Sequence, residues 1–295
     1  MKQLLILSGK GGTGKTTIAG AFIKLSKAKA YADCDVDAPN LHLILNHDSK
    51  PTIKNYYGLP KAEIDYDKCI NCGLCQKKCR FDAISKTNNR FDINYFSCEG
   101  CGVCEMICPV NAISMEENIA GKLTLYNDEK VFSTAELKMG NGTSGKLVSE
   151  VKSQMYEVAK DVDFAIIDGS PGIGCPVIAS LSGVDLVLIV AEPSISGITD
   201  MKRIIATAQK FGVQVVVCIN KYDINLENSK EIEKYCLQNN LIFAGKIPYD
   251  ISVVKAINSA ENIVNFDCPA SDAITEVYKK VIKLLLKERK NEWQY

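Results

Sequence analysis

The chain has 295 residues, and its 35 Lys and Arg balance 35 Asp and Glu, so the formal net charge is zero at pH 7. This balance argues against a nucleic-acid partner or an anionic lipid surface, both of which attract basic proteins. No apolar run reaches the roughly 18 residues of a membrane span, and the N-terminus lacks the layout of a signal peptide. We therefore expect a cytoplasmic protein with no membrane span, in which the 13 cysteines indicate metal binding rather than disulfides.

The N-terminal segment predicts a phosphate-binding loop. An apolar run from Gln3 to Leu7 predicts a buried parallel strand, and a helix is expected from about Lys15 to Lys27. Between them, residues 9–16 match G-x-x-x-x-G-K-[ST] in the strand-to-helix context that this motif requires. Lys15 is expected to reach the β- and γ-phosphates, and the Thr16 hydroxyl to bind Mg²⁺. The expected nucleotide-binding residues of this segment are Gly9, Gly11, Gly12, Thr13, Gly14, Lys15, Thr16 and Thr17.

Alternating strands and helices continue along most of the chain. Further strands are expected at 29–33, 164–167, 186–190 and 213–219, with a weaker candidate at 242–244, and helices at 146–159, 197–211 and 228–238. Residues 123–145 suggest a hairpin or loop. This alternation predicts an α/β fold, a parallel sheet with helices on both faces.

Between about Lys61 and Glu116 the alternation stops, and a cysteine repeat takes its place. Two runs read C-x-x-C-G-x-C-x-x-x-C, and each continues to Ala-Ile-Ser. In bacterial ferredoxins with this spacing, the fourth cysteine of each run ligates the other [4Fe–4S] cluster. The spacing therefore predicts cluster one on Cys69, Cys72, Cys75 and Cys108, and cluster two on Cys98, Cys101, Cys104 and Cys79.

Zinc is the main alternative metal for these cysteines, but it commonly takes separated C-x-x-C pairs. One departure from the ferredoxin pattern is Arg80, which follows Cys79 where Pro109 follows Cys108 in the second run. The sequence thus predicts a small α+β ferredoxin domain at 61–116, inserted into an α/β domain formed by 1–60 and 117–295.

Three segments give the chain a family resemblance. The loop Lys-Gly-Gly-x-Gly-Lys-Thr-Thr, which begins at Lys10, resembles the deviant phosphate loop of MinD/ParA-type P-loop ATPases, a group that includes the nitrogenase iron protein and Mrp-type cluster carriers. Asp33-Cys34-Asp35-Val36-Asp37-Ala38-Pro39-Asn40-Leu41 and Phe164-Ala165-Ile166-Ile167-Asp168-Gly169-Ser170-Pro171-Gly172 are similar to that family's switch I and switch II regions.

This resemblance implies roles for particular residues. Lys10 would reach across a homodimer, or a heterodimer with a related ATPase, to the partner's nucleotide. Asp35 would orient the attacking water and a water bound to Mg²⁺, and Asp168 would hold another Mg²⁺-bound water. Asp33 would lie at the strand end near the metal. Lys10, Lys15 and Asp35 are thus the expected catalytic residues of a Mg²⁺-dependent ATPase.

The base-binding end of the site is predicted from two later segments. Asn220-Lys221-Tyr222-Asp223 matches N-K-x-D, which reads guanine in GTPases, but in the resembled ATPases an Asn at this strand end contacts adenine. A later proline segment closes over the base there, and the segment around Pro248 is similar to it. We expect ATP, contacted by Asn220 and Pro248, with GTP as the alternative.

Two further segments carry weaker expectations. Cys175 follows switch II, near the position at which nitrogenase-like iron proteins place a ligand of a bridging cluster, but the second cysteine of that motif is not found in this sequence. The C-terminal stretch from Val277 to Arg289 is amphipathic and basic. We expect it to form a last helix against the sheet, with membrane association as the alternative.

Taken together, the resemblance implies an ATP-dependent dimer that controls an iron–sulfur module. The favoured function is assembly or delivery of an iron–sulfur or metal cofactor to a client protein. The alternative is an ATP-gated, low-potential electron donor, similar to the nitrogenase iron protein.

Overall fold

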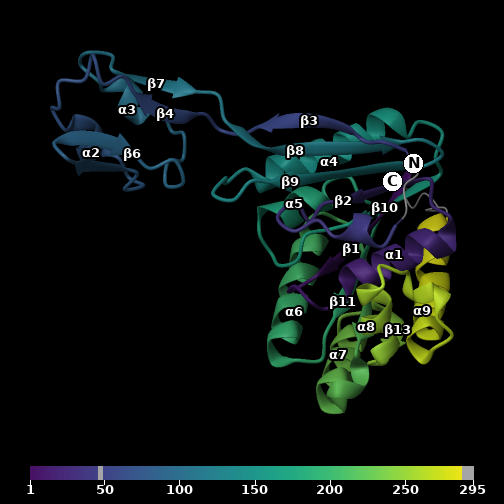
Figure 1. The fold of residues 1–295 in the computed structure, drawn as a ribbon. Coiled ribbons are helices and arrows are strands. Elements are labelled where there is room, and N and C mark those ends of the chain that lie inside the picture. The colour runs from purple at the N-terminus through teal and green to yellow at the C-terminus, as the bar shows by residue number, and fades with distance from the viewer. Residues whose placement is uncertain (46–48, 288–295) are drawn as a thin grey trace, which may run out of the picture. The chain divides into compact units, whose positions relative to one another are not determined.

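The computed structural model describes residues 1–45 and 49–287, and these divide into two compact units (Figure 1). The first unit comprises residues 1–52, 124–135 and 145 onward, and the second comprises residues 53–123 and 136–144. The second unit therefore contains the whole cysteine-rich segment together with short stretches on both sides of it.

A mostly parallel sheet forms the centre of the α/β fold. Its strand order is β13-β12-β11-β1-β10-β2-β9-β8-β3, and the pairs from β13 to β9 are all parallel. The strands are β1 (Lys2–Ser8), β2 (Ala30–Asp33), β3 (Thr52–Tyr57), β8 (Ile119–Asn127), β9 (Val131–Leu137), β10 (Phe164–Asp168), β11 (Leu186–Ala191), β12 (Gln214–Asn220) and β13 (Ile242–Ile247).

Helices cover this sheet, as the alternation of the sequence predicts. They are α1 (Lys15–Ser26), α4 (Ser144–Val158), α5 (Cys175–Leu181), α6 (Ile195–Lys210), α7 (Leu226–Gln238), α8 (Ile251–Asn258) and α9 (Pro269–Leu286). Short 3-10 turns lie at Leu41–Leu43, Tyr222–Ile224 and Ile263–Asn265. Within residues 1–45 and 49–287, none of the helices has the length and hydropathy needed to cross a bilayer.

The burial of β1 explains why its sequence is a continuous apolar run. Leu4 and Ile6 belong to a core that includes Phe22 of α1 and Val281 of α9. The neighbouring Leu5 and Leu7 point to the opposite face because side chains alternate along a strand, and they too are fully buried. Both faces of the sheet are therefore covered, with α1 and α9 on one side and α6 on the other (Figure 1).

The sequence predicts the hairpin of this sheet but not its edge strand. The hairpin expected within 123–145 is present as β8 and β9, which are neighbours joined by three residues, 128–130. The edge strand β3 was not expected, because its side chains are polar or exposed and only Tyr56 is buried. An edge strand needs no apolar face, so periodicity gives no signal for it.

The last helix packs on the sheet, as the sequence predicts. Ile274, Val277, Val281 and Leu285 of α9 are buried in the core that α1 shares. Residues 288–295, which include Arg289 at the end of the predicted basic stretch, lie outside the described residues.

The cysteine-rich part of the second unit, residues 61–116, forms two small antiparallel sheets and two short helices. Its elements are β4 (Lys61–Ile64), α2 (Leu74–Lys78), β5 (Ile84–Thr87), β6 (Arg90–Ile93), α3 (Val103–Met106) and β7 (Ile113–Glu116). Strand β4 pairs with β7, and β5 pairs with β6. The sequence repeat is thus a structural repeat, in which each helix lies within one cysteine run.

Candidate nucleotide site and cysteine quartets

The phosphate loop connects β1 to α1 and has glycine at two positions whose backbone conformation is left-handed. Gly12 and Gly14 have φ values of 77° and 87°, in the left-handed region that favours glycine. A Cβ atom at Gly14 would also overlap Nδ2 of Asn220. The Asn220 amide donates to the Thr13 carbonyl at 2.7 Å, so the end of β12 supports the loop directly.

Lys15 and Asp168 form a buried ion pair at the floor of the site. Their Nζ and Oδ1 atoms are 2.5 Å apart, and the side chains are 5% and 0% exposed. Thr16 lies beside them, with its hydroxyl 3.4 Å from Lys15 Nζ. Asp168 Oδ2 is buried and has no hydrogen-bond partner. An orphaned carboxylate oxygen at this point fits an oxygen ligand shell such as that of hydrated Mg²⁺.

Asp33 organises the switch I loop. It ends β2 in register with Asp168 of β10, and its carboxylate accepts backbone N–H groups from Asp35 at 3.0 Å and from Asn40 and Leu41 at 2.9 Å each. Burial, followed by the charge of Asp168, raises the pKa of Asp33 to about 7. The sequence suggested a place near the metal; the structure shows in addition that Asp33 fixes the loop that carries Asp35.

Asp35 is half-buried at the start of this loop. Burial is the main cause that raises its pKa to about 6, and the charges of Asp168 and Asp37 add to it, whereas Lys15 opposes them. A carboxylate with a pKa near neutrality suits the acceptance of a proton from water. Asp35, Asp168, Lys15 and Thr16 are therefore brought to one place, although they come from three distant segments.

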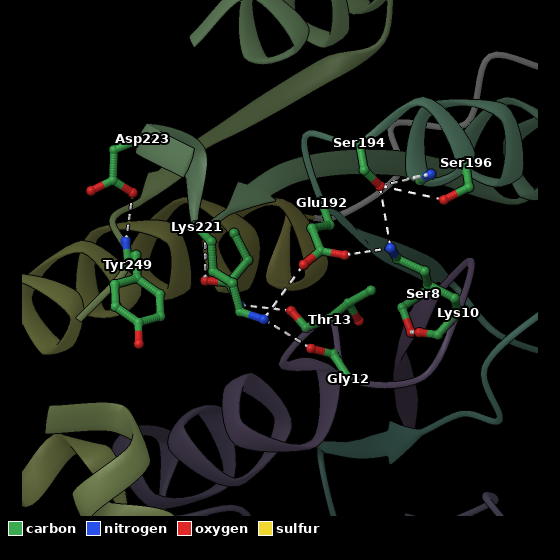
Figure 2. A network of polar contacts seen from close by, with 12 residues as sticks. Ser8, Lys10, Gly12, Thr13, Glu192, Ser194, Ser196, Lys221, Asp223 and Tyr249 are labelled. Carbon is green, nitrogen blue, oxygen red and sulfur yellow. Dashed lines mark hydrogen bonds and ion pairs between the residues drawn. The ribbon is translucent and has the colours of Figure 1, made fainter. Parts of the chain in front are cut away.

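A polar network joins the phosphate loop to the end of β11 (Figure 2). Glu192 forms ion pairs with Lys10, at 2.7 Å, and with Lys221, at 3.5 Å. Lys10 also donates to Ser194 Oγ at 3.2 Å, and Lys221 donates to the Gly12 carbonyl at 3.0 Å. In this chain Lys10 is therefore held by Glu192 of the same subunit.

Sequence reasoning missed Glu192 as part of the site. Burial acts to raise the pKa of Glu192, but the hydrogen bond from Lys10 and the charge of Lys221 outweigh it, so the pKa is lowered overall. The available signal was its position two residues after a predicted buried strand, where the carboxyl ends of parallel strands meet.

The loops expected to bind the base lie together. Asp223 Oδ1 accepts the Tyr249 N–H at 2.7 Å (Figure 2), which ties the turn after β12 to the segment that contains Pro248, directly after β13. Gly9 and Gly11 lie in the phosphate loop, and Thr17 lies in the first turn of α1. The nucleotide-contacting roles of these residues stay predictions.

Switch II follows β10 and contacts the neighbouring strand and loop. Gly169 and Gly172 donate their N–H groups to the carbonyls of Ile6 and Ser8, each at 2.9 Å. Ser170 Oγ donates to the Cys34 carbonyl at 2.6 Å, which links switch II to switch I. Cys175 is exposed at the start of α5, and its role as a bridging ligand stays a prediction.

The eight repeat cysteines lie around two separate cavities of the second unit. One cavity is lined by Cys69, Cys72, Cys75 and Cys108, and the other by Cys79, Cys98, Cys101 and Cys104. Each quartet takes three cysteines from one run and the fourth from the other, which is the grouping that the spacing predicts. The remaining wall residues are mostly apolar, among them Phe91 and Pro109 in the first cavity and Phe81 and Met115 in the second.

The donor chemistry of these quartets fits an iron–sulfur cluster, which takes four cysteine thiolates. Over the described ranges 1–45 and 49–287, no three or more His, Cys, Asp or Glu side chains converge on the position of a single metal ion. The quartets line cavity walls instead.

Comparison with known proteins places the chain in a family. The family model of the CobQ/CobB/MinD/ParA nucleotide binding domain matches residues 4–263. The chain belongs to this family. As a CobQ/CobB/MinD/ParA protein with a complete phosphate loop, it is a P-loop ATPase.

Individual relatives and one solved structure are similar to this chain over most of their length. An uncharacterized protein of Methanocaldococcus jannaschii is 35% identical over 95% of this chain and 96% of its own length. An iron-sulfur cluster carrier protein of Pyrococcus horikoshii is 25% identical over 96% of this chain and 86% of that protein. The structure of septum site-determining protein MinD from Pyrococcus horikoshii, complexed with Mg-ADP, matches with a TM-score of 0.57 at 18% identity and covers 96% of both chains. At that identity, the last match shows the fold.

Proposed function

We propose that this ATPase carries two [4Fe–4S] clusters in a ferredoxin-like insert and uses ATP to control them during assembly or delivery of an iron–sulfur or metal cofactor. The observation that carries the proposal is the grouping of the eight cysteines. Two successive runs, which exchange their fourth cysteines, supply two quartets, each at its own cavity, within a chain whose other unit is a P-loop ATPase.

The clusters would be held by thiolates alone. Cys69, Cys72, Cys75 and Cys108 would hold cluster one, and Cys98, Cys101, Cys104 and Cys79 cluster two. When bound, such clusters accept and release single electrons. Most of the cavity walls are apolar, and Cys72 and Cys101 are exposed to solvent. The proposed ferredoxin-like domain would occupy about 61–116, inserted into an α/β domain formed by 1–60 and 117–295.

In the proposed nucleotide site, the phosphate loop binds ATP and Mg²⁺. Backbone N–H groups and Lys15 neutralise the phosphates, the Thr16 hydroxyl binds the metal, and Asp168 binds it through water. Asp35 accepts the proton of the attacking water. The Mg-ADP complex of the related MinD structure supports this assignment.

Dimerisation is part of the proposal. Lys10 would leave Glu192 and reach the nucleotide of a partner subunit, either a second copy or a related ATPase. The Glu192 contacts support such a switch, because the ion pair with Lys10 is partly exposed, and ion pairs in contact with solvent contribute only ~1 kcal/mol or less and exchange readily. A conformational change in switch I and switch II, at Asp35 and Asp168, would then be transmitted to the insert. A client protein would receive a cluster.

Electron transfer is a second candidate function, and one observation favours it. All four thiolates of each proposed cluster come from the same chain, and most of the cavity walls are apolar. Such closed coordination suits a cluster that stays bound while it is oxidised and reduced. The acceptor would then be a client protein that needs low-potential electrons.

An assay of cluster transfer separates the two functions. The reconstituted protein is mixed anaerobically with an apo-acceptor and an iron chelator, with and without ATP. Delivery predicts that iron moves to the acceptor faster with ATP and that a Lys15→Gln variant shows no acceleration. Clusters that stay on the protein through every round of ATP hydrolysis would contradict delivery and favour electron transfer.

A further inference from the structure

The two cysteine runs sit in matching structural surroundings, so the two quartets can be compared position by position. The Cys69 N–H donates to the Asp65 carbonyl and the Cys98 N–H to the Asn94 carbonyl, both at 3.0 Å. Strands β4 and β6 precede the runs at equivalent positions, and each begins with a cation, Lys61 or Arg90.

The two cations lie over equivalent tyrosines but differ in burial. Lys61 Nζ is 5.0 Å from the centroid of the Tyr95 ring, and Arg90 Cζ is 5.5 Å from that of Tyr66. Lys61 is 8% exposed, and its ammonium donates a hydrogen bond to the Cys98 carbonyl. Arg90 is exposed to solvent. A buried ammonium therefore stands beside one quartet, while its counterpart at the other quartet is solvated.

Burial decides how strongly each cation acts on a nearby cluster. Reduction adds one negative charge to a cluster, so a neighbouring positive charge stabilises the reduced form. Over the same distance, the Coulomb interaction is several times stronger at a protein site than in bulk water. Salt screens exposed charges such as Arg90 much more than buried ones. Lys61 should thus favour reduction at the quartet that contains Cys98.

Two other groups act in the opposite sense. Glu99 lines the cavity of the same quartet, but its side chain is exposed, so salt screens its charge more than that of the buried Lys61. The Ala112 N–H donates to Cys108 Sγ at 3.2 Å, and a hydrogen bond to sulfur favours the reduced form of the other quartet. This donor is a neutral dipole, whereas Lys61 carries a full charge, and interactions that involve an ionised group are roughly twice as strong. The charge is therefore the larger effect.

We propose that Lys61 gives the cluster on Cys98, Cys101, Cys104 and Cys79 the higher reduction potential, so that a single electron delivered to the pair resides there. This inference rests on the proposed occupancy of both quartets by [4Fe–4S] clusters. The electron comes from an external low-potential one-electron donor, and its transfer makes or breaks no covalent bond. Lys61 is then a redox-tuning residue that makes the two halves of the repeat unequal.

The test is a redox titration of the full-length protein, reconstituted anaerobically, reduced stepwise with dithionite and followed by EPR spectroscopy. Iron and sulfide are quantified first in every variant. Lys61→Gln keeps a hydrogen-bond donor but removes the charge, and Lys61→Arg keeps the charge. Arg90→Gln is the matched control at the equivalent position of the other half.

Lys61→Gln is expected to lower the reduction potential of the higher-potential step by about 59 mV, which corresponds to a roughly tenfold less favourable one-electron reduction. Lys61→Arg should leave this step near its wild-type potential, and Arg90→Gln should shift either step much less. The inference is overturned if Lys61→Gln leaves both potentials unchanged, if it shifts only the lower step, or if Arg90→Gln has an equal effect.

A second variant tests the charge without removing Lys61. Lys61 lines a small cavity with Glu99, Asn141, Gly142 and Thr143, and Asn141→Asp adds a carboxylate there. The higher potential should fall in this variant as well, and an unchanged potential would overturn the inference. A wild-type protein without iron–sulfur signals would refute the proposed function instead, which keeps the two failures distinct.

Discussion

At the scale of single residues, Glu192 connects the parts of the nucleotide site. It holds Lys10 and Lys221, and Lys221 in turn bonds to the phosphate loop at the Gly12 carbonyl. The loop geometry and the proposed partner-reaching lysine therefore depend on the same carboxylate.

A Glu192→Gln variant should be less stable than the wild type at pH 7 by about 1 kcal/mol, the range of partly exposed ion pairs. The pKa of Glu192 is lowered in the folded protein. Its ionised form therefore contributes stability above the unfolded pKa of about 4.3, and this contribution is lost as the pH falls through the folded pKa. Urea unfolding at pH 7 and near pH 3 measures this difference.

The control is Glu231→Gln, which removes a more exposed pair with Lys202 and should cost less. A Glu192→Gln difference that stays constant from pH 7 to pH 3 would show that the charge of Glu192 is not its source.

Gly14 supports a second prediction at this scale. Gly14→Ala combines a φ of 87° with an overlap on Asn220, so the loop and Asn220 must both move, and ATP binding measured by calorimetry should be lost. Gly212→Ala is the matched control, because Gly212 has a φ of 67° but open space around it. It should lower stability by about 1 kcal/mol and leave ATP binding intact. Equal binding by both variants would contradict the role given to the Gly14–Asn220 contact.

Some residues of the nucleotide site were predictable from the sequence, and others were not. Lys15, Thr16, Asp35 and Asp168 were predictable because the phosphate loop has fixed spacing and acids follow its neighbouring strands. Glu192 was not predictable, because an acidic residue after a strand is common and only the folded structure brings it next to Lys10. Asp33 was expected near the metal, whereas its three backbone N–H bonds depend on a loop conformation that no periodicity encodes.

At the scale of elements, α4 connects switch II to strands that lead to the second unit. Lys152 is 5% exposed and donates to the carbonyls of Ser180 and Ser182, at the end of α5. Gln154 of the same helix donates to the Thr124 carbonyl of β8 and to Ser133 Oγ of β9. Helix α4 is thus tied both to the helix that follows switch II and to both strands of the hairpin.

A Lys152→Met variant should lower the free energy of unfolding by about 2–4 kcal/mol, because two carbonyls lose a charged donor in a buried site. Chemical denaturation followed by circular dichroism gives the value. Lys146→Met, at an exposed position of the same helix, should cost less than about 0.5 kcal/mol. Similar losses for the two variants would show that the contacts of Lys152 with α5 contribute little.

Most elements of the α/β unit were predictable because buried parallel strands are continuous apolar runs. Strand β12 and helices α6 and α7 lie within a few residues of the predicted ranges. The exposed edge strand β3 and the four-residue strands of the second unit carry no such run. The cysteine repeat, rather than periodicity, indicated the organisation of that unit.

At the scale of the whole molecule, the two units differ in what can stabilise them. The first has an extensive apolar core, whereas the hydrophobic cluster in the cysteine-rich part of the second has only four buried members, Ala62, Ala83, Cys98 and Ile113, and four further repeat cysteines pack against it. Domains with so little buried apolar surface usually need metals or disulfides. The proposed clusters would supply that stability.

Removal of iron by a chelator should therefore unfold the second unit and leave the first folded. Hydrogen exchange is expected to become fast across about residues 61–116, with little change in β1, β10 and β11. Retained protection of the cysteine segment without metal would contradict this account of its stability. Readdition of iron and sulfide under reducing conditions provides the control for reversibility.

The central claim is that one chain holds two [4Fe–4S] clusters under the control of ATP. Its most direct test is quantitative EPR of the anaerobically purified, dithionite-reduced protein, recorded with Mg-ATP and with Mg-ADP. The account predicts two reduced clusters per chain and a spectrum that differs between the nucleotides in the wild type but not in Lys15→Gln. Zinc in the quartets, or identical spectra with both nucleotides, would contradict it.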